Sequence, residues 1–185
     1  MLSELEPIIN VKEHVEKSIE HLTELRENIS SLNISENNLS LNLAKWIKDI
    51  PIIYYPFGLQ SAAIRFKNSL QENSKMHAII EEVVEAGHNG IVSWESPSNF
   101  QPILLRGKDD YFKTIKLWEI LKEYFTEKKI DFYEIMSPEG HILSKLAYLI
   151  YLLDYSAIYL LVLRGIDPSP VKSIDFVKRR INSSV

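Results

Sequence analysis

Hydrophobic residues recur along this chain with two different spacings, which separate expected helices from expected strands. From Val11 to Ile29, apolar positions step by three and four, as on one face of an amphipathic helix. The run from Asn28 to Asn42 is rich in Asn and Ser, whose side chains compete for backbone hydrogen bonds, so it predicts a loop or linker. We therefore expect a helix and polar linker over 1–42 and a compact domain over 43–185.

The compact part alternates short apolar runs with longer helical stripes. This alternation predicts an α/β fold, in which helices cover both faces of a parallel sheet. In such sheets the site lies at the carboxyl edge of the strands. Asp109 or Asp110 is expected to cap a helix. Strands are expected at 50–55, 77–80, 102–105 and 131–135, and helices at 59–70, 81–94, 110–125, 141–164 and from 170 onward.

The segment from Leu146 to Leu163 is apolar enough to suggest a membrane span, because its only charged residue is Asp154. Its Tyr and Ser side chains, and the cost of an Asp at a membrane centre, favour a helix buried in a soluble core. A membrane-anchored protein is the alternative. The first residues lack the basic and apolar regions of a signal peptide, so a cytoplasmic protein is expected.

Composition narrows the possible chemistry. The chain has 21 Lys and Arg against 25 Asp and Glu, a net charge of −4, so it lacks the positive field that favours nucleic acid. It has no cysteine, which excludes disulfides, thiol nucleophiles and Cys-based metal sites. His77, His88 and His141 show no paired ligand spacing, and no Gly-rich nucleotide loop is present. We expect no metal or cofactor.

Three polar segments could carry chemistry. The segment 71–75 ends a helix and places a carboxylate near a cation, and 86–90 is a Gly-flanked turn that holds His88, whose imidazole suits proton transfer near neutral pH. The third, 163–170, combines a helix stop with an expected N-cap. Taken singly, each also has a purely structural interpretation as a solvated helix end, a loop or a cap.

Together the three segments resemble the C-terminal half of the bifunctional phosphoglucose/phosphomannose isomerase family. Members carry a segment like Gln-x-Asn-Glu-Asn-Ala-Lys, then His-Asn with a nearby Trp-Glu, and later Arg-Gly-x-Asp-Pro-Thr-Pro-Val. The matching residues are Leu-Gln-Glu-Asn-Ser-Lys at 70–75, His-Asn-Gly-Ile-Val-Ser-Trp-Glu at 88–95 and Arg-Gly-Ile-Asp-Pro-Ser-Pro-Val at 164–171. The resemblance runs from about residue 42 to residue 181.

The resemblance implies a single sugar-isomerase (SIS) subdomain, a three-layer αβα sandwich with a flavodoxin-like parallel sheet. It also implies aldose–ketose isomerisation of a hexose 6-phosphate, glucose or mannose 6-phosphate to fructose 6-phosphate, through a cis-enediol. By motif position Glu72 is the base, and His88 assists ring opening at the site of a neighbouring subunit. The implied catalytic residues are Glu72, His88 and Lys178, and the implied substrate-binding residues are Ser169, Arg65, Lys75 and Asn89.

The chain also departs from the family pattern. His77 replaces a family Pro, Gly90 replaces the usual Glu, and 55–57 interrupts a Gly-containing turn. Full-length members have two such subdomains, and the first carries a Ser-x-Ser-Gly-x-Thr cluster that holds the sugar phosphate. This sequence has no such cluster. We therefore expect a homodimer or a complex with an N-terminal SIS half. The alternative is a catalytically degenerate SIS domain that binds a phosphosugar or another protein.

Overall fold

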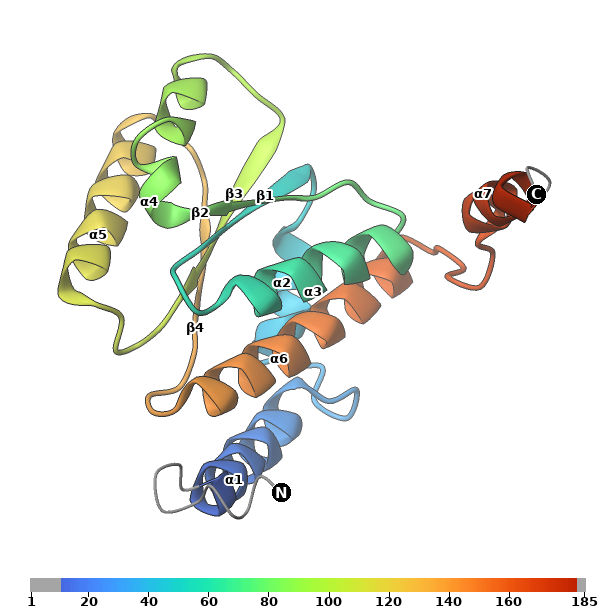
Figure 1. Ribbon diagram of the computed structural model, residues 1–185, viewed down its shortest axis with the longest axis horizontal. Coiled ribbons are helices and arrows are strands. Elements are labelled where there is room, and N and C mark those ends of the chain that lie inside the picture. Colours follow the sequence, from blue (N-terminus) through green and yellow to red (C-terminus); the bar gives the residue numbers. More distant parts are fainter. Residues whose placement is uncertain (1–10, 183–185) are drawn as a thin grey trace.

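A parallel β-sheet forms the centre of the computed structural model, which describes residues 11–182 (Figure 1). Within this range the sheet has four strands in the order β2-β1-β3-β4, and all neighbours are parallel. The α/β class expected from the alternating pattern is confirmed, because parallel neighbours require helical crossovers. The strands are β1 (Ile50–Tyr55), β2 (Ile79–Glu82), β3 (Phe100–Arg106) and β4 (Tyr133–Met136).

Alternation along the central strand β1 divides the apolar side chains between two cores. Ile53 and Tyr55 pack on one face of the sheet, whereas Ile52 and Tyr54 pack on the other. Because helices cover both faces, β1 is apolar along its whole length instead of alternating with polar residues.

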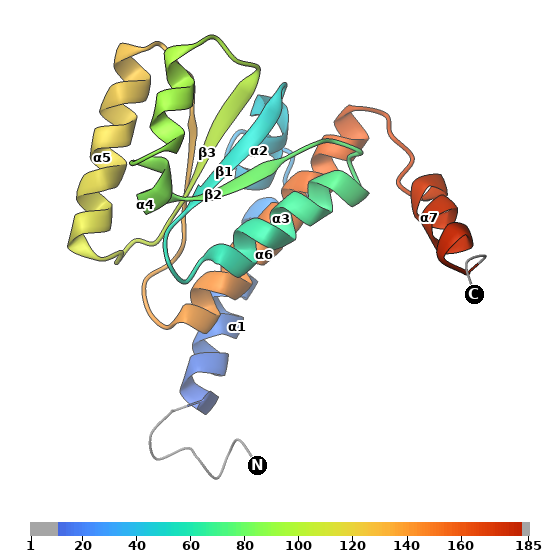
Figure 2. The ribbon, with the colours of Figure 1, turned by 45° about the horizontal axis from the view of Figure 1, so that its top comes forward.

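Four helices contribute to the core on the first face. The last of them packs against each of the other three (Figures 1 and 2), and Tyr159 ties the last to the first by donating its hydroxyl to the Ile29 carbonyl at 2.7 Å. Their buried residues form the larger core. These helices are α1 (Val11–Ile29), α2 (Leu39–Trp46), α3 (Gln60–Glu72) and α6 (Ile142–Leu163).

The second face is covered by a smaller, more aromatic layer. Trp118 and Phe125 are fully buried there, and Trp94 donates its indole N–H to the Tyr54 hydroxyl at 2.9 Å. This layer comprises α4 (Val83–Ala86), the 3₁₀ helix η2 (Gly90–Glu95) and α5 (Phe112–Glu127). The three-layer αβα arrangement follows from these two coverings.

Some local expectations were wrong. The polar run expected as a loop contains the start of α2, which Asn38 caps by accepting a hydrogen bond from the Leu41 N–H at 2.8 Å. Neither expected aspartate caps α5, because Asp109 pairs with Lys145 and Asp110 closes the turn after β3.

The apolar helix α6 is a core helix on one side only. Leu149, Leu153 and Leu160 are buried against the sheet layer. By length and composition α6 could cross a membrane, yet 33% of its most apolar 18-residue window is buried inside the protein. Tyr151 and Tyr155 are partly buried against the same core, whereas Ile158 and Val162 are exposed, and the α6 ribbon runs between α1 and α3 (Figure 1).

The last helix, α7 (Lys172–Asn182), stands clear of the three layers in both views (Figures 1 and 2). None of its residues is buried.

Candidate functional site

Glu72, the expected base, is the last residue of α3. The buried face of this helix, which includes Ala63, Phe66 and Leu70, anchors it in the larger core. Because α3 leads from the end of β1 to the start of β2, its last turn lies at the amino edge of the sheet, opposite the carboxyl edge at which the α/β pattern predicts a site. The Glu72 side chain is exposed there, and it makes no hydrogen bond or ion pair within residues 11–182. The fold therefore presents a carboxylate at the end of a rigid helix.

The segments 70–75 and 164–171 meet at this helix end. Lys75 donates its Nζ to the Glu72 carbonyl at 2.8 Å and to the Pro168 carbonyl at 3.1 Å. Arg164 donates to the Ser74 carbonyl at 3.0 Å. Two motifs that are distant in sequence thus form one corner beside Glu72, which we call the Glu72 corner (residues 70–75 and 164–171).

Ser169, an expected substrate-binding residue, belongs to the same corner. Its backbone N–H donates to the Asp167 carboxylate at 2.9 Å, and this bond lowers the pKa of Asp167. The ammonium of Lys75 adds to the effect. The Ser169 side chain also hydrogen-bonds the Asp167 carboxylate and lowers its pKa further, so local bonds hold this exposed turn.

Arg65 lies two turns before Glu72 and connects α3 with α6. Its Nε and Nη2 form a fork on the Asp154 carboxylate, with Nη2 to Oδ2 at 2.9 Å, and this pairing raises the pKa of Arg65. An arginine held in this way braces two helices. Its predicted role in binding substrate stays a prediction.

His88 and Asn89 lie on the other face of the sheet, in the turn between α4 and η2. Both side chains are exposed, and the Asn89 amide donates to the Glu85 carboxylate. Since α3 covers the first face, one copy of the chain does not bring His88 and Glu72 together. The resemblance implied this separation when it assigned His88 to a neighbouring subunit, and that assignment stays a prediction.

Gly90 lies against the end of the Glu81 side chain. A Cβ atom at Gly90 would lie 2.4 Å from Oε1 of Glu81, and the flexible end of that side chain would have to shift to admit it. Burial, and then the nearby Glu85, raises the pKa of Glu81. A glutamate at position 90 would add one more carboxylate beside those of Glu81 and Glu85.

Lys178, the third expected catalytic residue, is exposed on α7. The helix α7 stands clear of the three layers (Figure 2), and within residues 11–182 Lys178 makes no hydrogen bond or ion pair with Glu72.

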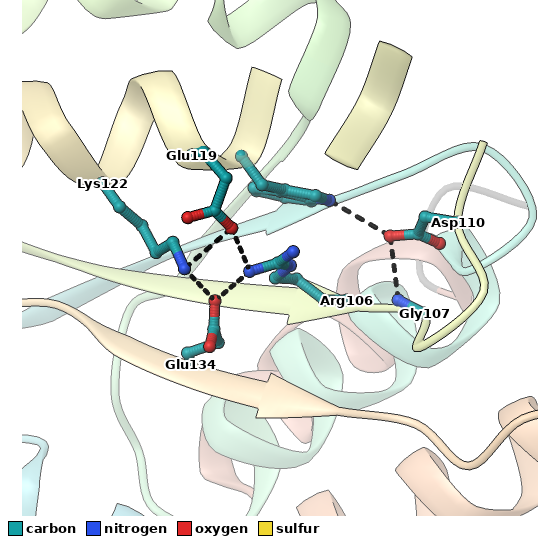
Figure 3. Close-up of polar contacts among 7 residues, drawn as sticks. Arg106, Gly107, Asp110, Glu119, Lys122 and Glu134 are labelled. Atoms are coloured by element: carbon teal, nitrogen blue, oxygen red, sulfur yellow. Dashed lines mark hydrogen bonds and ion pairs between the residues drawn. The ribbon is translucent and has the colours of Figure 1, made fainter. Parts of the chain in front are cut away.

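A charged cluster that the sequence did not reveal lies at the carboxyl edge of the sheet (Figure 3). Arg106, only 7% exposed, ends β3 and donates its Nη1 to Glu119 at 3.1 Å and to Glu134. Lys122 reaches the same carboxylates at 2.9 and 3.3 Å. We call these four residues the Arg106 network. Its two cations match its two carboxylates, so it carries no surplus charge for an anionic ligand.

Asp110 closes the turn beside this network. Its carboxylate accepts hydrogen bonds from the Gly107 N–H at 3.0 Å and from the Trp118 indole at 3.1 Å (Figure 3). Burial raises the pKa of Asp110. Among residues 11–182, no three His, Asp or Glu side chains come together in a group that could hold a metal ion.

Comparison with known proteins gives the family. Residues 36–181 match the family described as bacterial phospho-glucose isomerase C-terminal SIS domain. The bifunctional phosphoglucose/phosphomannose isomerase of Caldicellulosiruptor bescii is 33% identical over 92% of this chain and 52% of its own length. The same enzyme of Aquifex aeolicus is 26% identical over 98% of this chain and 56% of its own.

Solved structures confirm the fold. A glucose-6-phosphate isomerase-like protein of Thermus thermophilus superposes with a TM-score of 0.69 at 20% identity, covering 86% of this chain and 55% of that protein. This chain spans about half the length of the curated relatives it matches. The family match covers residues 36–181, which include all three motifs and the αβα layers. The chain therefore belongs to the family of bacterial phosphoglucose isomerase C-terminal SIS domains.

Proposed function

We propose that this chain is the base-bearing half of a hexose 6-phosphate isomerase, which interconverts glucose or mannose 6-phosphate and fructose 6-phosphate. The observation that carries the proposal is the Glu72 corner, where two family motifs meet beside an exposed carboxylate. Family membership supplies the reaction class. A carboxylate at a fixed helix end can remove and return a proton beside a carbonyl group.

In the proposed reaction Glu72 takes the proton from C2 of the open-chain aldose and returns it to C1 of the enediol. The electron pair of the C2–H bond forms the C1=C2 double bond of the enediol, and the C1 oxygen gains a proton. In the second half the C2 hydroxyl loses a proton, the C2=O bond forms, and the electron pair of the double bond takes the proton that Glu72 returns to C1. No net oxidation occurs, so the reaction needs no redox cofactor. His88 of a neighbouring copy exchanges a proton with the ring oxygen, and Lys178 completes the proposed catalytic set. Ser169, Arg65, Lys75 and Asn89 are proposed to bind the substrate.

The proposed enzyme also needs an N-terminal SIS subdomain that holds the sugar phosphate. This sequence has no hydroxyl cluster of the Ser-x-Ser-Gly-x-Thr type, and the relatives are almost twice as long as the matched region. Binding energy from a phosphate that does not react normally helps to position the reacting carbons. The chain on its own is therefore expected to turn over poorly.

The test is reconstitution. The chain is mixed with the N-terminal half of the Caldicellulosiruptor bescii isomerase, and fructose 6-phosphate is measured from glucose and from mannose 6-phosphate. We expect the mixture to exceed the summed rates of the separate halves. Binding heats of fructose 6-phosphate, measured on the mixture, separate failure to bind from failure to react. Binding without turnover in the wild-type mixture would contradict the enzymatic proposal.

The absent phosphate cluster and Gly90 favour a second candidate function, a SIS domain that binds a phosphosugar or a protein without catalysis. This candidate predicts that a hexose 6-phosphate at millimolar concentration raises the melting temperature of the chain while the reconstituted mixture stays inactive. If the chain serves only as a protein scaffold, no hexose phosphate changes the melting temperature.

A further inference from the structure

A cavity of about 300 Å³ lies at the amino edge of the sheet, where the carboxyl ends of α2 and α6 meet. Parts of the segments 44–48 and 160–164 form its walls, together with Met76, which stands between α3 and β2. We call it the amino-edge cavity. Its size falls at the lower end of the range for small-ligand sites. The proposed isomerisation does not use it, and only Arg164 is shared with the Glu72 corner.

The charged residues of the amino-edge cavity are all basic. They are Lys45, Lys48 and Arg164, and no Asp or Glu among the described residues lines it. Neither lysine ammonium makes a hydrogen bond or ion pair within residues 11–182. Arg164 donates only to the neutral Ser74 carbonyl, and Asp49 lines a separate cavity. The cavity therefore carries uncompensated positive charge in a chain whose net charge is −4.

A role at helix ends does not account for these cations. Basic residues in a last helical turn commonly bond to the last carbonyls of their own helix. The Lys45 ammonium bonds to no carbonyl of the described chain, and Lys48 lies beyond the end of α2. Arg164 follows α6 but donates to Ser74, which follows α3. All three side chains instead line the cavity.

The remaining wall of the cavity is apolar. Ile47 and Leu160 are each 2% exposed and belong to the larger core, Met76 is half-buried against it, and Leu163 is 52% exposed. A ligand with many hydroxyl groups would lose water at this wall without gaining hydrogen-bond partners. A ring or a short alkyl chain would gain from burial there. The wall therefore favours an anion with an apolar part over a hexose phosphate.

We propose that the amino-edge cavity binds a phosphate monoester whose organic part is apolar. A phosphate dianion, with three acceptor oxygens, matches three cations better than a carboxylate does. Arg164 keeps one N–H on Ser74 and offers its other donors to the phosphate, while Lys45 and Lys48 act as point charges. The organic part lies on the apolar wall. Through Arg164 the ligand contacts a residue that holds the Glu72 corner in place.

Isothermal titration of the full chain with phenyl phosphate at low ionic strength tests the proposal. We expect one binding site per chain. Phenyl phosphate should bind about tenfold more tightly than inorganic phosphate, because its ring is buried on the apolar wall.

Matched variants locate the site. The double variant Lys45→Gln with Lys48→Gln should weaken phenyl phosphate binding roughly tenfold or more. The control is Lys113→Gln with Lys116→Gln, which removes the same charge from exposed positions of α5 on the other face of the sheet. It should change the affinity less than about twofold, because salt screens distant charges. Leu163→Ser should weaken phenyl phosphate but leave inorganic phosphate unchanged. Unchanged circular dichroism melts show that the variants fold.

Three outcomes overturn the proposal: no binding heat with millimolar phenyl phosphate, equal losses in the two double variants, and equal affinity for phenyl phosphate and inorganic phosphate. The titration uses the chain alone and measures no turnover. Its failure would therefore leave the proposed isomerase function standing, and an inactive reconstituted mixture would leave this site standing.

Discussion

Two charged regions at opposite edges of one sheet use their charges in different ways. At the carboxyl edge, the guanidinium of Arg106 is buried and shared by two carboxylates, and Lys122 balances the Arg106 network. At the amino edge, Lys75 and Arg164 bind backbone carbonyls, and the Glu72 carboxylate stays exposed. In the Arg106 network the charges neutralise one another and hold α5 against the sheet. The Glu72 carboxylate, exposed at a rigid helix end, is instead available to a substrate.

The largest expected effect on stability lies in the Arg106 network. Arg106→Met should lower the free energy of unfolding by about 2–3 kcal/mol, because Glu134 and Glu119 lose a shared partner. Arg65→Met is the control. The Arg65 side chain is 59% exposed, so loss of its pair with Asp154 should cost less than about 1 kcal/mol. Urea unfolding measures both, and equal losses would contradict the greater stability that we assign to the buried pairs of Arg106.

A smaller effect is expected at the Glu72 corner. Lys75 has a left-handed backbone, with φ at 51°, which costs energy for any residue with a Cβ atom. Lys75→Ala and Lys75→Gly both remove the ammonium, but glycine also relieves the backbone. Lys75→Gly should therefore be about 1 kcal/mol more stable than Lys75→Ala. Thermal melts of the pair decide this, and identical stability would argue against the strained corner.

The smallest expected effect is a pH dependence of the Arg106 network. Hydrogen bonding to Lys122 lowers the pKa of Glu119 in the folded state. A carboxylate with a lowered pKa adds stability above its unfolded pKa and loses it as the pH falls through the folded pKa. Glu119 is 56% exposed, so the gain is only a few tenths of a kcal/mol. Glu119→Gln should make the urea midpoint less sensitive to pH below about 4.5. A steeper acid loss in the variant would contradict the sign.

Much of the fold follows from local pattern, because periodicity records which side of an element is buried. The stripe from Val11 to Ile29 and the apolar run 50–55 both appear as expected. The second strand was expected at 77–80 and lies at Ile79–Glu82, since the chain first turns at Lys75. The helix α2 was missed because Asn38, one of many Asn and Ser residues in that run, acts as an N-cap.

The site was less predictable, because it depends on contacts between distant parts of the chain. No local pattern shows that Lys75 reaches Pro168, or that Arg106 is shared by Glu119 and Glu134. The family resemblance singled out Glu72 and the segment 164–171 as parts of the site, yet it did not show that they lie close together. The sequence holds one sign of the Arg106 network, an arginine as the last residue of a buried apolar strand.

Isotope exchange at the proposed base tests the central claim most directly. The chain, combined with a phosphate-binding half in D₂O, is expected to introduce deuterium at C1 of fructose 6-phosphate. Glu72→Gln should slow this exchange by about 10²–10⁴-fold, because the amide cannot accept the proton. Glu127→Gln, at the exposed end of α5, is the matched control and should exchange at the wild-type rate. Exchange at the wild-type rate in Glu72→Gln would contradict the account.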